Sequence, residues 1–173
     1  MIGYADVGYL SDPHKARSQM GYVFSYGGTT ISWGSVKQTM VTTSSNHLEI
    51  LAIHEASREC VWLRSMIQHI QEICGLPSIR DNAIVLHEDN TTWIAQIKGR
   101  FIKGDRTKHI SHKFFYTHEL QKKYEINVQQ IRSYNNLADL FTKVLLSTTL
   151  EKLRYDIWIR RLRDLPFEML KKL

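Results

Sequence analysis

The chain is poor in cysteine and proline, and none of its apolar runs approaches the ~18 residues that a membrane helix requires. Its two cysteines, Cys60 and Cys74, fall on one predicted helix, roughly 20 Å apart at ~1.5 Å per residue, so they cannot form a disulfide. The first six residues lack the basic and apolar regions of a secretory signal. We therefore expect a protein with free thiols in a reducing compartment, cytoplasmic or nuclear, neither secreted nor in a membrane.

Acidic residues are outnumbered by basic ones, which gives a net charge of +6 and a pI of about 9.3. This balance favours polyanionic partners, although ordinary solubility charge explains it equally well. The basic residues gather in one segment of sixteen residues that contains a single acid, Asp105. Such a segment is either a solvated loop or a region that contacts phosphates; its basic residues are Lys98, Arg100, Lys103, Arg106, Lys108, His109, His112 and Lys113.

The first part of the chain has the alternation and turn residues of an antiparallel meander. Residues 2–10 and the β-rich runs 21–26 and 29–33 are predicted strands, and Gly27-Gly28 between the latter two indicates a hairpin. Residues 37–43 are either a further strand or a continuation of the third. A long helix follows up to Gly75 and Pro77, because apolar residues recur at intervals of three and four at Ile53, Ala56, Cys60, Leu63, Ile67, Ile70 and Cys74.

The second part alternates strands and helices. We predict strands over 83–87 and 126–131 and helices over 90–98, 111–124 and 136–143, with a last helix from Thr148. This order predicts an α/β fold with a mixed five-stranded sheet flanked by helices. We expect one domain over residues 1–145 and a C-terminal helical extension over residues 146–173.

Four carboxylates occupy core-directed positions on four separate elements: Asp6, Glu49, Asp89 and Asp139. Each has an ordinary explanation. Glu49 and Asp139 follow an Asn by three residues, as in a capping box, Asp89 can cap the next helix, and Asp6 can face solvent. Four acids in such positions nevertheless suggest a cluster, and a buried cluster of carboxylates requires cations. All-oxygen ligation suits Mg²⁺ or Mn²⁺, and two such ions ~3.5–4 Å apart are an established arrangement for hydrolysing phosphodiesters.

Longer motifs carry a resemblance to a known family. They are "GYADVGYLSDPHKARSQMGYVFSYGG", "ISWGSVKQTMVTTSSNHLEILA", "EASRECVWLR", "HEDNTTWIAQI", "KGDRTKHISHKFFYTHELQ" and "VQQIRSYNNLADLFTK". In this order they resemble the ribonuclease H domain of copia-type retrotransposon polyproteins, particularly those of plants, from Ile2 to about Leu165. The resemblance implies a ribonuclease H fold and cleavage of the RNA strand of RNA–DNA hybrids during reverse transcription, in the cytoplasmic virus-like particles of the parent element.

The same resemblance assigns the four acids as catalytic ligands of two Mg²⁺ or Mn²⁺ ions. Asp6 is expected to bridge both ions, Asp139 to hold the ion on the nucleophile side, and Glu49 and Asp89 the other. Glu88, which alternation directs away from Asp89, is expected to be a bystander. We expect the hybrid to be held by its shape and backbone in a salt-sensitive manner, through the basic segment and the polar side chains of Gln38, Ser45, Asn46 and Asn90.

Three departures from the family pattern bear on activity. Cellular ribonucleases H carry a loop His shortly before the last Asp, and residues 131–138 contain none; His109 is a candidate substitute or a surface residue of a phosphate-binding loop. Leu48 stands where relatives commonly have Ala, and it either perturbs the site or packs in the core. The chain begins just before Gly3-Tyr4-Ala5-Asp6, so we expect a detached C-terminal fragment without its reverse transcriptase domain. A catalytically silent nucleic-acid-binding or structural remnant is therefore the alternative function.

Overall fold

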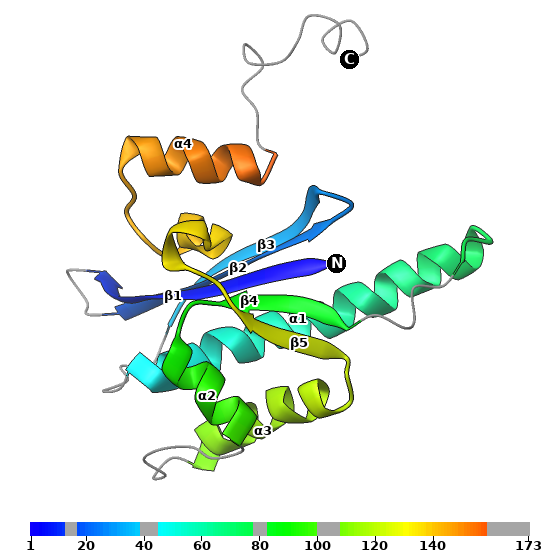
Figure 1. Cartoon of the computed structure of the whole chain (residues 1–173), viewed down its shortest axis with the longest axis horizontal. Coiled ribbons are helices and arrows are strands. Elements are labelled where there is room, and N and C mark those ends of the chain that lie inside the picture. The colour runs from blue at the N-terminus through cyan, green and yellow to red at the C-terminus, as the bar shows by residue number, and fades with distance from the viewer. Residues whose placement is uncertain (13–16, 39–44, 78–82, 100–107, 159–173) are drawn as a thin grey trace, which may run out of the picture.

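The elements follow one another in the order that periodicity predicts. In a computed structural model, residues 1–12, 17–38, 45–77, 83–99 and 108–158 are described. Figure 1 shows the strands β1 (Ile2–Asp12), β2 (Arg17–Tyr26), β3 (Thr29–Lys37), β4 (Ile84–Glu88) and β5 (Ile126–Gln130). The helices are α1 (Ser45–Ile73), α2 (Thr91–Gly99), α3 (Lys108–Lys122) and α4 (Ser147–Asp156), with 3-10 turns η1 (Ser133–Asn135) and η2 (Leu137–Phe141).

The five strands form one mixed sheet in the order β3-β2-β1-β4-β5. The first three are antiparallel neighbours, and β4 and β5 are parallel to β1. The turn between β2 and β3 contains Gly27 and Gly28 with φ values of 59° and 83°, a region that favours glycine. The predicted hairpin and the predicted mixed five-stranded α/β sheet are both confirmed.

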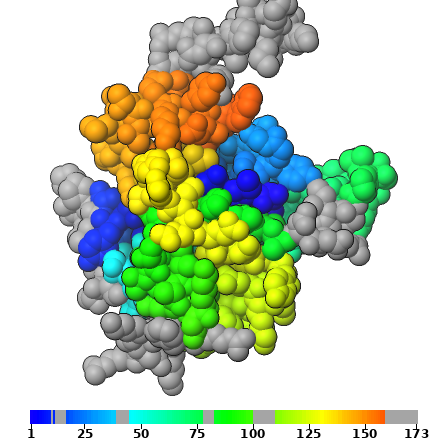
Figure 2. Space-filling view, viewed as in Figure 1, coloured from blue at the N-terminus to red at the C-terminus, as the bar shows by residue number. Residues whose placement is uncertain are grey.

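The sheet has a helical layer on each face. Helices α1, α2 and α3 cover one face, and η2 and α4 lie over the other (Figure 1). In the space-filling view of Figure 2, the segment with η1 and η2 fills the space between α4 and the strands. The main core lies on the first face, because apolar residues of β1, β2 and β4 alternate toward it; its largest fully buried members include Phe24, Ile50, Ile53, Leu86, Trp93 and Phe114.

Helix α1 is longer than the sheet it covers. Its predicted apolar stripe is buried at Ile53, Ala56, Cys60 and Leu63, but Ile70 is 49% exposed. The C-terminal part of α1 projects past the strands (Figure 1), so the end of the stripe has no sheet to cover. Cys60 is buried, Cys74 is exposed, and both thiols are free as predicted. Among the residues that the structure describes, no helix is long and apolar enough to cross a membrane.

Several predicted boundaries differ from the structure. Strand β3 ends at Lys37, and residues 39–43 of the predicted further strand lie outside the described residues. Helix α3 begins at Lys108, three residues before the predicted start. The segment 136–143, predicted as a helix, contains only the five-residue 3-10 turn η2, because the Asn136 side chain accepts a hydrogen bond from the Ala138 N–H and starts a tight turn.

Candidate active site

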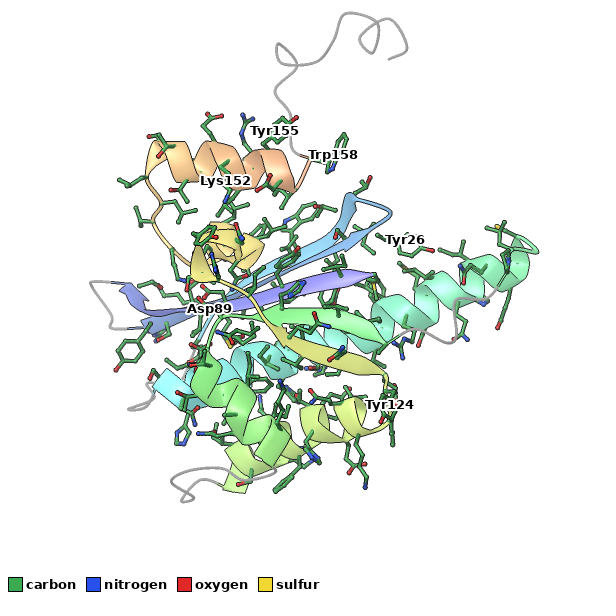
Figure 3. The ribbon with its side chains drawn as sticks, viewed as in Figure 1. Tyr26, Asp89, Tyr124, Lys152, Tyr155 and Trp158 are labelled. Atoms are coloured by element: carbon green, nitrogen blue, oxygen red, sulfur yellow. The ribbon has the colours of Figure 1, made fainter. Side chains whose placement is uncertain are left out.

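Two of the predicted acids lie at the same level of neighbouring parallel strands. Strand β1 pairs with β4 so that Tyr4 is opposite His87. Asp6 and Asp89 each come two residues later, Asp6 still within β1 and Asp89 just past the end of β4. Figure 3 labels Asp89 where the chain leaves β4 for α2. Parallel pairing therefore brings these two acids to one region of the sheet, as the sequence predicts.

Asp139 lies in the same region as Asp6 because a hydrogen bond holds η2 on β1. The Asn136 side-chain amide is fully buried and donates a hydrogen bond of 2.8 Å to the Ala5 carbonyl oxygen, next to Asp6. Glycines let η2 approach the sheet. A Cβ at Gly8 would overlap the Thr142 carbonyl oxygen, and one at Gly21 would lie 2.7 Å from Thr142 Cγ2. Close backbone contact thus sets the position of Asp139.

Lys143 joins Asp6 and Asp139. Its Nζ lies 3.0 Å from Asp6 Oδ1 and 2.8 Å from Asp139 Oδ1. The Thr142 hydroxyl donates to the other oxygen of Asp6. Both carboxylates are buried, whereas the lysine side chain is 35% exposed. Asp6 is therefore held from two sides by consecutive residues that follow η2, neither of which stands out in the sequence.

Glu49 lies on the other face of the sheet, at the start of α1. Its Oε1 is 3.4 Å from Asn90 Nδ2, and Asn90 Oδ1 accepts a hydrogen bond of 3.0 Å from the Trp93 N–H. Asn90 therefore caps α2 and contacts the predicted catalytic Glu at the same time. The capping role considered for Asp89 belongs to Asn90, because α2 begins at Thr91.

Glu88 points to the opposite face of the sheet from Asp89. It shares the buried face of β4 with Ile84 and Leu86, and its side chain is fully buried. Its Oε1 accepts backbone hydrogen bonds of 3.1 Å from Asp89 and Asn90. Alternation places it on the α1 side, as predicted, but the first turns of α1 bring Glu49 to the same place.

The acids perturb one another's protonation. Burial raises the pKa of the Glu49 carboxyl to about 8, and the charge of Asp6 adds to this effect. Burial also raises the pKa of Asp139 to about 6, against the hydrogen bond from Lys143. The pKa of Glu88 is raised well above its ordinary value, mainly by burial and secondly by the neighbouring charge of Glu49. Burial and neighbouring acids thus both disfavour the charged forms of these carboxyl groups, a pattern that is common at functional sites.

The chemistry of these groups fits divalent cations. All the donors are carboxylate oxygens, which Mg²⁺ and Mn²⁺ prefer. Glu49 Oε2 and Glu88 Oε2 are buried without a hydrogen-bond partner, a costly state that a cation relieves. Among the described residues, no three His, Cys, Asp or Glu side chains form a ready-made metal cluster. Asp6 and Asp139 instead surround the Lys143 ammonium on one face, and Glu49 and Glu88 lie on the other.

No family model matches the chain, but curated relatives do. It is 29% identical over 143 residues to the retrovirus-related Pol polyprotein from transposon TNT 1-94 of Nicotiana tabacum, and 25% identical over 158 residues to that from transposon RE1 of Arabidopsis thaliana. These alignments cover 83% and 91% of this chain but only 10% of each polyprotein. A shorter match is to the secreted RxLR effector protein 161 of Plasmopara viticola. It is 41% identical over 63 residues and covers 36% of this chain and 44% of that protein.

Solved structures show the same fold at low identity. Ribonuclease H1 from Halobacterium salinarum is 17% identical, with a TM-score of 0.57 over 82% of this chain and 92% of that one. LC11 ribonuclease H1 in complex with an RNA/DNA hybrid is 17% identical with a TM-score of 0.54 and the same coverage. The chain is a relative of plant transposon Pol polyproteins and has the ribonuclease H fold. The resemblance inferred from the motifs is confirmed at this level.

The polar residues predicted to contact a hybrid are placed unevenly on this ribonuclease H fold. Ser45 is exposed at the start of α1, and Asn90 lies beside Glu49. Asn46 donates a hydrogen bond to Gln96 across to α2, at 3.1 Å. Gln38 is only 4% exposed, and its amide donates to Met20 Sδ. Gln38 therefore packs against the protein where the sequence predicts a surface donor.

The predicted basic segment falls only partly within the described part of the ribonuclease H fold. Lys98 is exposed at the end of α2, whereas Lys113 is turned toward α1, with Nζ 3.7 Å from Glu55 Oε1. The remaining predicted phosphate contacts, Arg100, Lys103 and Arg106, lie outside the described residues, as do the side chains of Lys108 and His109. Leu48 is fully buried against Val7 and Ala52, so of its two predicted roles the packing role is observed.

The raised pKa of Glu49 predicts a pH-dependent stability. Its folded pKa of about 8 exceeds the ordinary value of 4.5, so the charge of Glu49 destabilises the metal-free fold progressively as the pH rises through this window. Burial lowers the pKa values of His54 and His87, which acts in the opposite sense, so the effect must be isolated with a variant. We therefore compare the free energy of unfolding of Glu49→Gln with that of the wild type in the presence of a chelator. The difference, variant minus wild type, should increase by at least about 2 kcal/mol between pH 5 and pH 8.

Urea denaturation at several pH values measures this difference. Glu59→Gln is a control on the same helix, because Glu59 accepts a hydrogen bond from Ser32 of β3 and lies ten residues along α1 from Glu49. The difference in unfolding free energy between Glu59→Gln and the wild type should not increase in the same way with pH. A difference between Glu49→Gln and the wild type that stays constant with pH would show that Glu49 is not held in an acidic, desolvated cluster.

Proposed function

We propose that this chain is the ribonuclease H part of a transposon Pol polyprotein and that it hydrolyses the RNA strand of RNA–DNA hybrids with two Mg²⁺ or Mn²⁺ ions. The observation that supports the proposal is the pairing of Asp6 with Asp139 through Lys143, together with the charges of Asp6 and Asp89, which act on both Glu49 and Asp139 and, after burial, raise their pKa values. The structural neighbour LC11 ribonuclease H1 was solved in complex with an RNA/DNA hybrid, which supports the substrate class.

The position of each acid suggests which metal ion it would bind. Asp6 lies centrally, and its charge acts on both Glu49 and Asp139, so it is the best placed acid to be shared between two ions. Asp139 would hold an ion on the η2 side, and Glu49 with Asp89 would hold one on the α1 side. When bound, the ions supply an activated water and stabilise charge on the leaving oxygen. Asn90 orients Glu49 through its amide and fixes the start of α2 through its cap.

The partners of the proposed nuclease follow from its relatives. The chain spans about a tenth of the length of the Pol polyproteins that it matches. We propose that the reverse transcriptase domain of such a polyprotein produces the hybrid on which this part acts. Exposed Lys98 and the basic residues after it would contact phosphates, so binding of the hybrid should weaken as the salt concentration rises.

A labelled hybrid incubated with the purified chain tests the proposal. We expect products cut in the RNA strand with Mg²⁺ or Mn²⁺ and none with a chelator. Single-stranded RNA and duplex DNA of the same sequence are the substrate controls, and Asp89→Asn is the protein control, since it removes one ligand charge just past the end of β4 (Figure 3). Equal background in the wild type and in Asp89→Asn would contradict the proposed activity.

A second candidate, a catalytically silent nucleic-acid-binding remnant, is favoured by one observation. The Lys143 ammonium lies between Asp6 and Asp139, where the proposed nuclease needs a metal ion. The two functions differ in the same assay, because a silent remnant binds the hybrid at low salt and leaves both strands intact with either metal.

A further inference from the structure

Lys143 has the position of a bound cation and not that of a surface residue. Its side chain starts from the turn after η2 and carries its ammonium to two carboxylates that are 3% and 11% exposed. Lysine Nζ has three donor hydrogens, and two of them are used by Asp6 at 3.0 Å and Asp139 at 2.8 Å. Two buried carboxylates thus share a single positive charge.

We propose that Lys143 is the built-in counter-cation of the metal-free site, and that a divalent cation binds Asp6 and Asp139 by displacing the Lys143 ammonium. This inference rests on the proposed function, because it takes the same two acids as metal ligands. It assigns to Lys143 an electrostatic role: the residue offsets part of the charge of the two acids in the metal-free protein and thereby sets how tightly they bind a metal ion.

The charges at the site support displacement over coexistence. An ammonium and a divalent cation that share the same two carboxylate oxygens repel each other at close range. The acids that act most strongly on Lys143 are Asp6 and Asp139, the charge of Lys143 also reaches Glu49, and the charge of Asp89 acts on Asp139. A divalent ion can interact with all of these acids, whereas the ammonium compensates only one charge.

The lysine is also able to leave the site. Its side chain is 35% exposed, so a flexible four-carbon stem can carry the ammonium into solvent without unfolding the turn. Thr142 and Asn136 do not depend on it: Thr142 keeps its contact with Asp6, and Asn136 keeps η2 on the Ala5 carbonyl. The two carboxylates therefore remain in place after the ammonium has left.

Titration with Mn²⁺ alone, followed by calorimetry on the whole chain, tests the inference. Lys143→Met should bind Mn²⁺ about tenfold more tightly than the wild type, because the ion no longer has to displace a charge that occupies the same two carboxylates, and a tenfold change corresponds to about 1.4 kcal/mol. Lys143→Arg keeps the charge and should stay within about twofold of the wild type. Lys122→Met removes a lysine of α3 that pairs at 4.0 Å with Glu119 only at the surface, and should also leave Mn²⁺ affinity unchanged.

A structural readout accompanies the affinities. Without metal, Lys143→Met should have a lower Tm than the wild type, because two buried acids lose their cation, and saturating Mn²⁺ should raise its Tm by more than it raises that of the wild type. If Lys143→Met does not fold, the side-chain NMR signal of Lys143 in the wild type replaces it. This signal, assigned by its loss in Lys143→Arg, should move toward that of an exposed lysine on addition of Mg²⁺.

The outcomes separate this inference from the proposed function. Equal or weaker Mn²⁺ binding by Lys143→Met, or an NMR signal that Mg²⁺ leaves unchanged, would overturn the inference even if the wild type cleaves the hybrid. Tighter binding by Lys143→Met in a protein that cleaves no hybrid would uphold the inference and contradict the nuclease function. Absence of Mn²⁺ binding in every variant would overturn both.

Discussion

Replacement of Asp6 by Asn is expected to lower the rate of hybrid cleavage by about 10³-fold, the upper end of what loss of one preorganised charge contact costs. The Asn side chain has nearly the same shape, so Thr142 and Gly21 keep their places around it. What is lost is a charge that acts on both Glu49 and Asp139, and with it the ligand proposed to be shared between two ions. Initial rates with a labelled hybrid at saturating Mg²⁺ measure the effect.

Asp156→Asn is the matched control for this prediction. Asp156 is exposed at the end of α4, so the same chemical change there should leave the rate within about twofold of the wild type. Thermal unfolding of both variants checks that they are folded. A loss of less than about tenfold in well-folded Asp6→Asn would contradict the central role of Asp6.

The second large effect is expected from Gly8→Ala, which should lower the free energy of unfolding by about 3 kcal/mol. Gly8 lies in β1, opposite Gln19 of β2, and a Cβ there would overlap the Thr142 carbonyl oxygen. Neither backbone can move freely, since Gly8 is paired with Gln19 of β2 and η2 is tied to Ala5 by Asn136. Chemical denaturation of the metal-free protein measures the loss.

Gly27→Asn provides the comparison for Gly8→Ala. Gly27 has a φ of 59° in the β2–β3 turn, a Cβ added there would meet no atom within 4 Å, and Asn tolerates this backbone conformation. This variant should cost less than about 1 kcal/mol. Equal losses in the two variants would show that close packing of η2 on β1 is not what Gly8 provides. Because Thr142 contacts Asp6, Gly8→Ala should also reduce hybrid cleavage in the folded fraction.

Local patterns in the sequence determined most of the secondary structure. Spacings of three and four predict α1, alternation predicts the strands, and the two glycines at 27 and 28 predict the hairpin. These patterns are reliable here because each element presents one apolar face to a single core. They do not show where the sheet ends, so they give no sign that Ile70, which belongs to the apolar stripe of α1, is exposed in the structure.

The candidate site was predictable in its acids but not in their neighbours. Asp6, Glu49, Asp89 and Asp139 stand out because carboxylates at core-directed positions are costly, and the family motifs contain them. Glu88 also lies next to Asp89 in the sequence, but alternation alone directs it away from the site. Only the tertiary structure shows that the start of α1 brings Glu49 close enough to Glu88 for the two charges to act on each other.

The sequence by itself therefore determined the order of the elements and the mixed sheet, because these depend on periodicity, and it predicted four candidate acids from their residue type and position. The tertiary structure decided which groups surround those acids. Lys143 is 137 residues from Asp6 in the chain, and nothing in the local pattern of either predicts their contact. The contact exists because Gly8 of β1 and Gly21 of β2 let η2 and the residue after it lie directly on the sheet and Asn136 holds η2 there, so that a lysine just beyond the turn reaches both carboxylates.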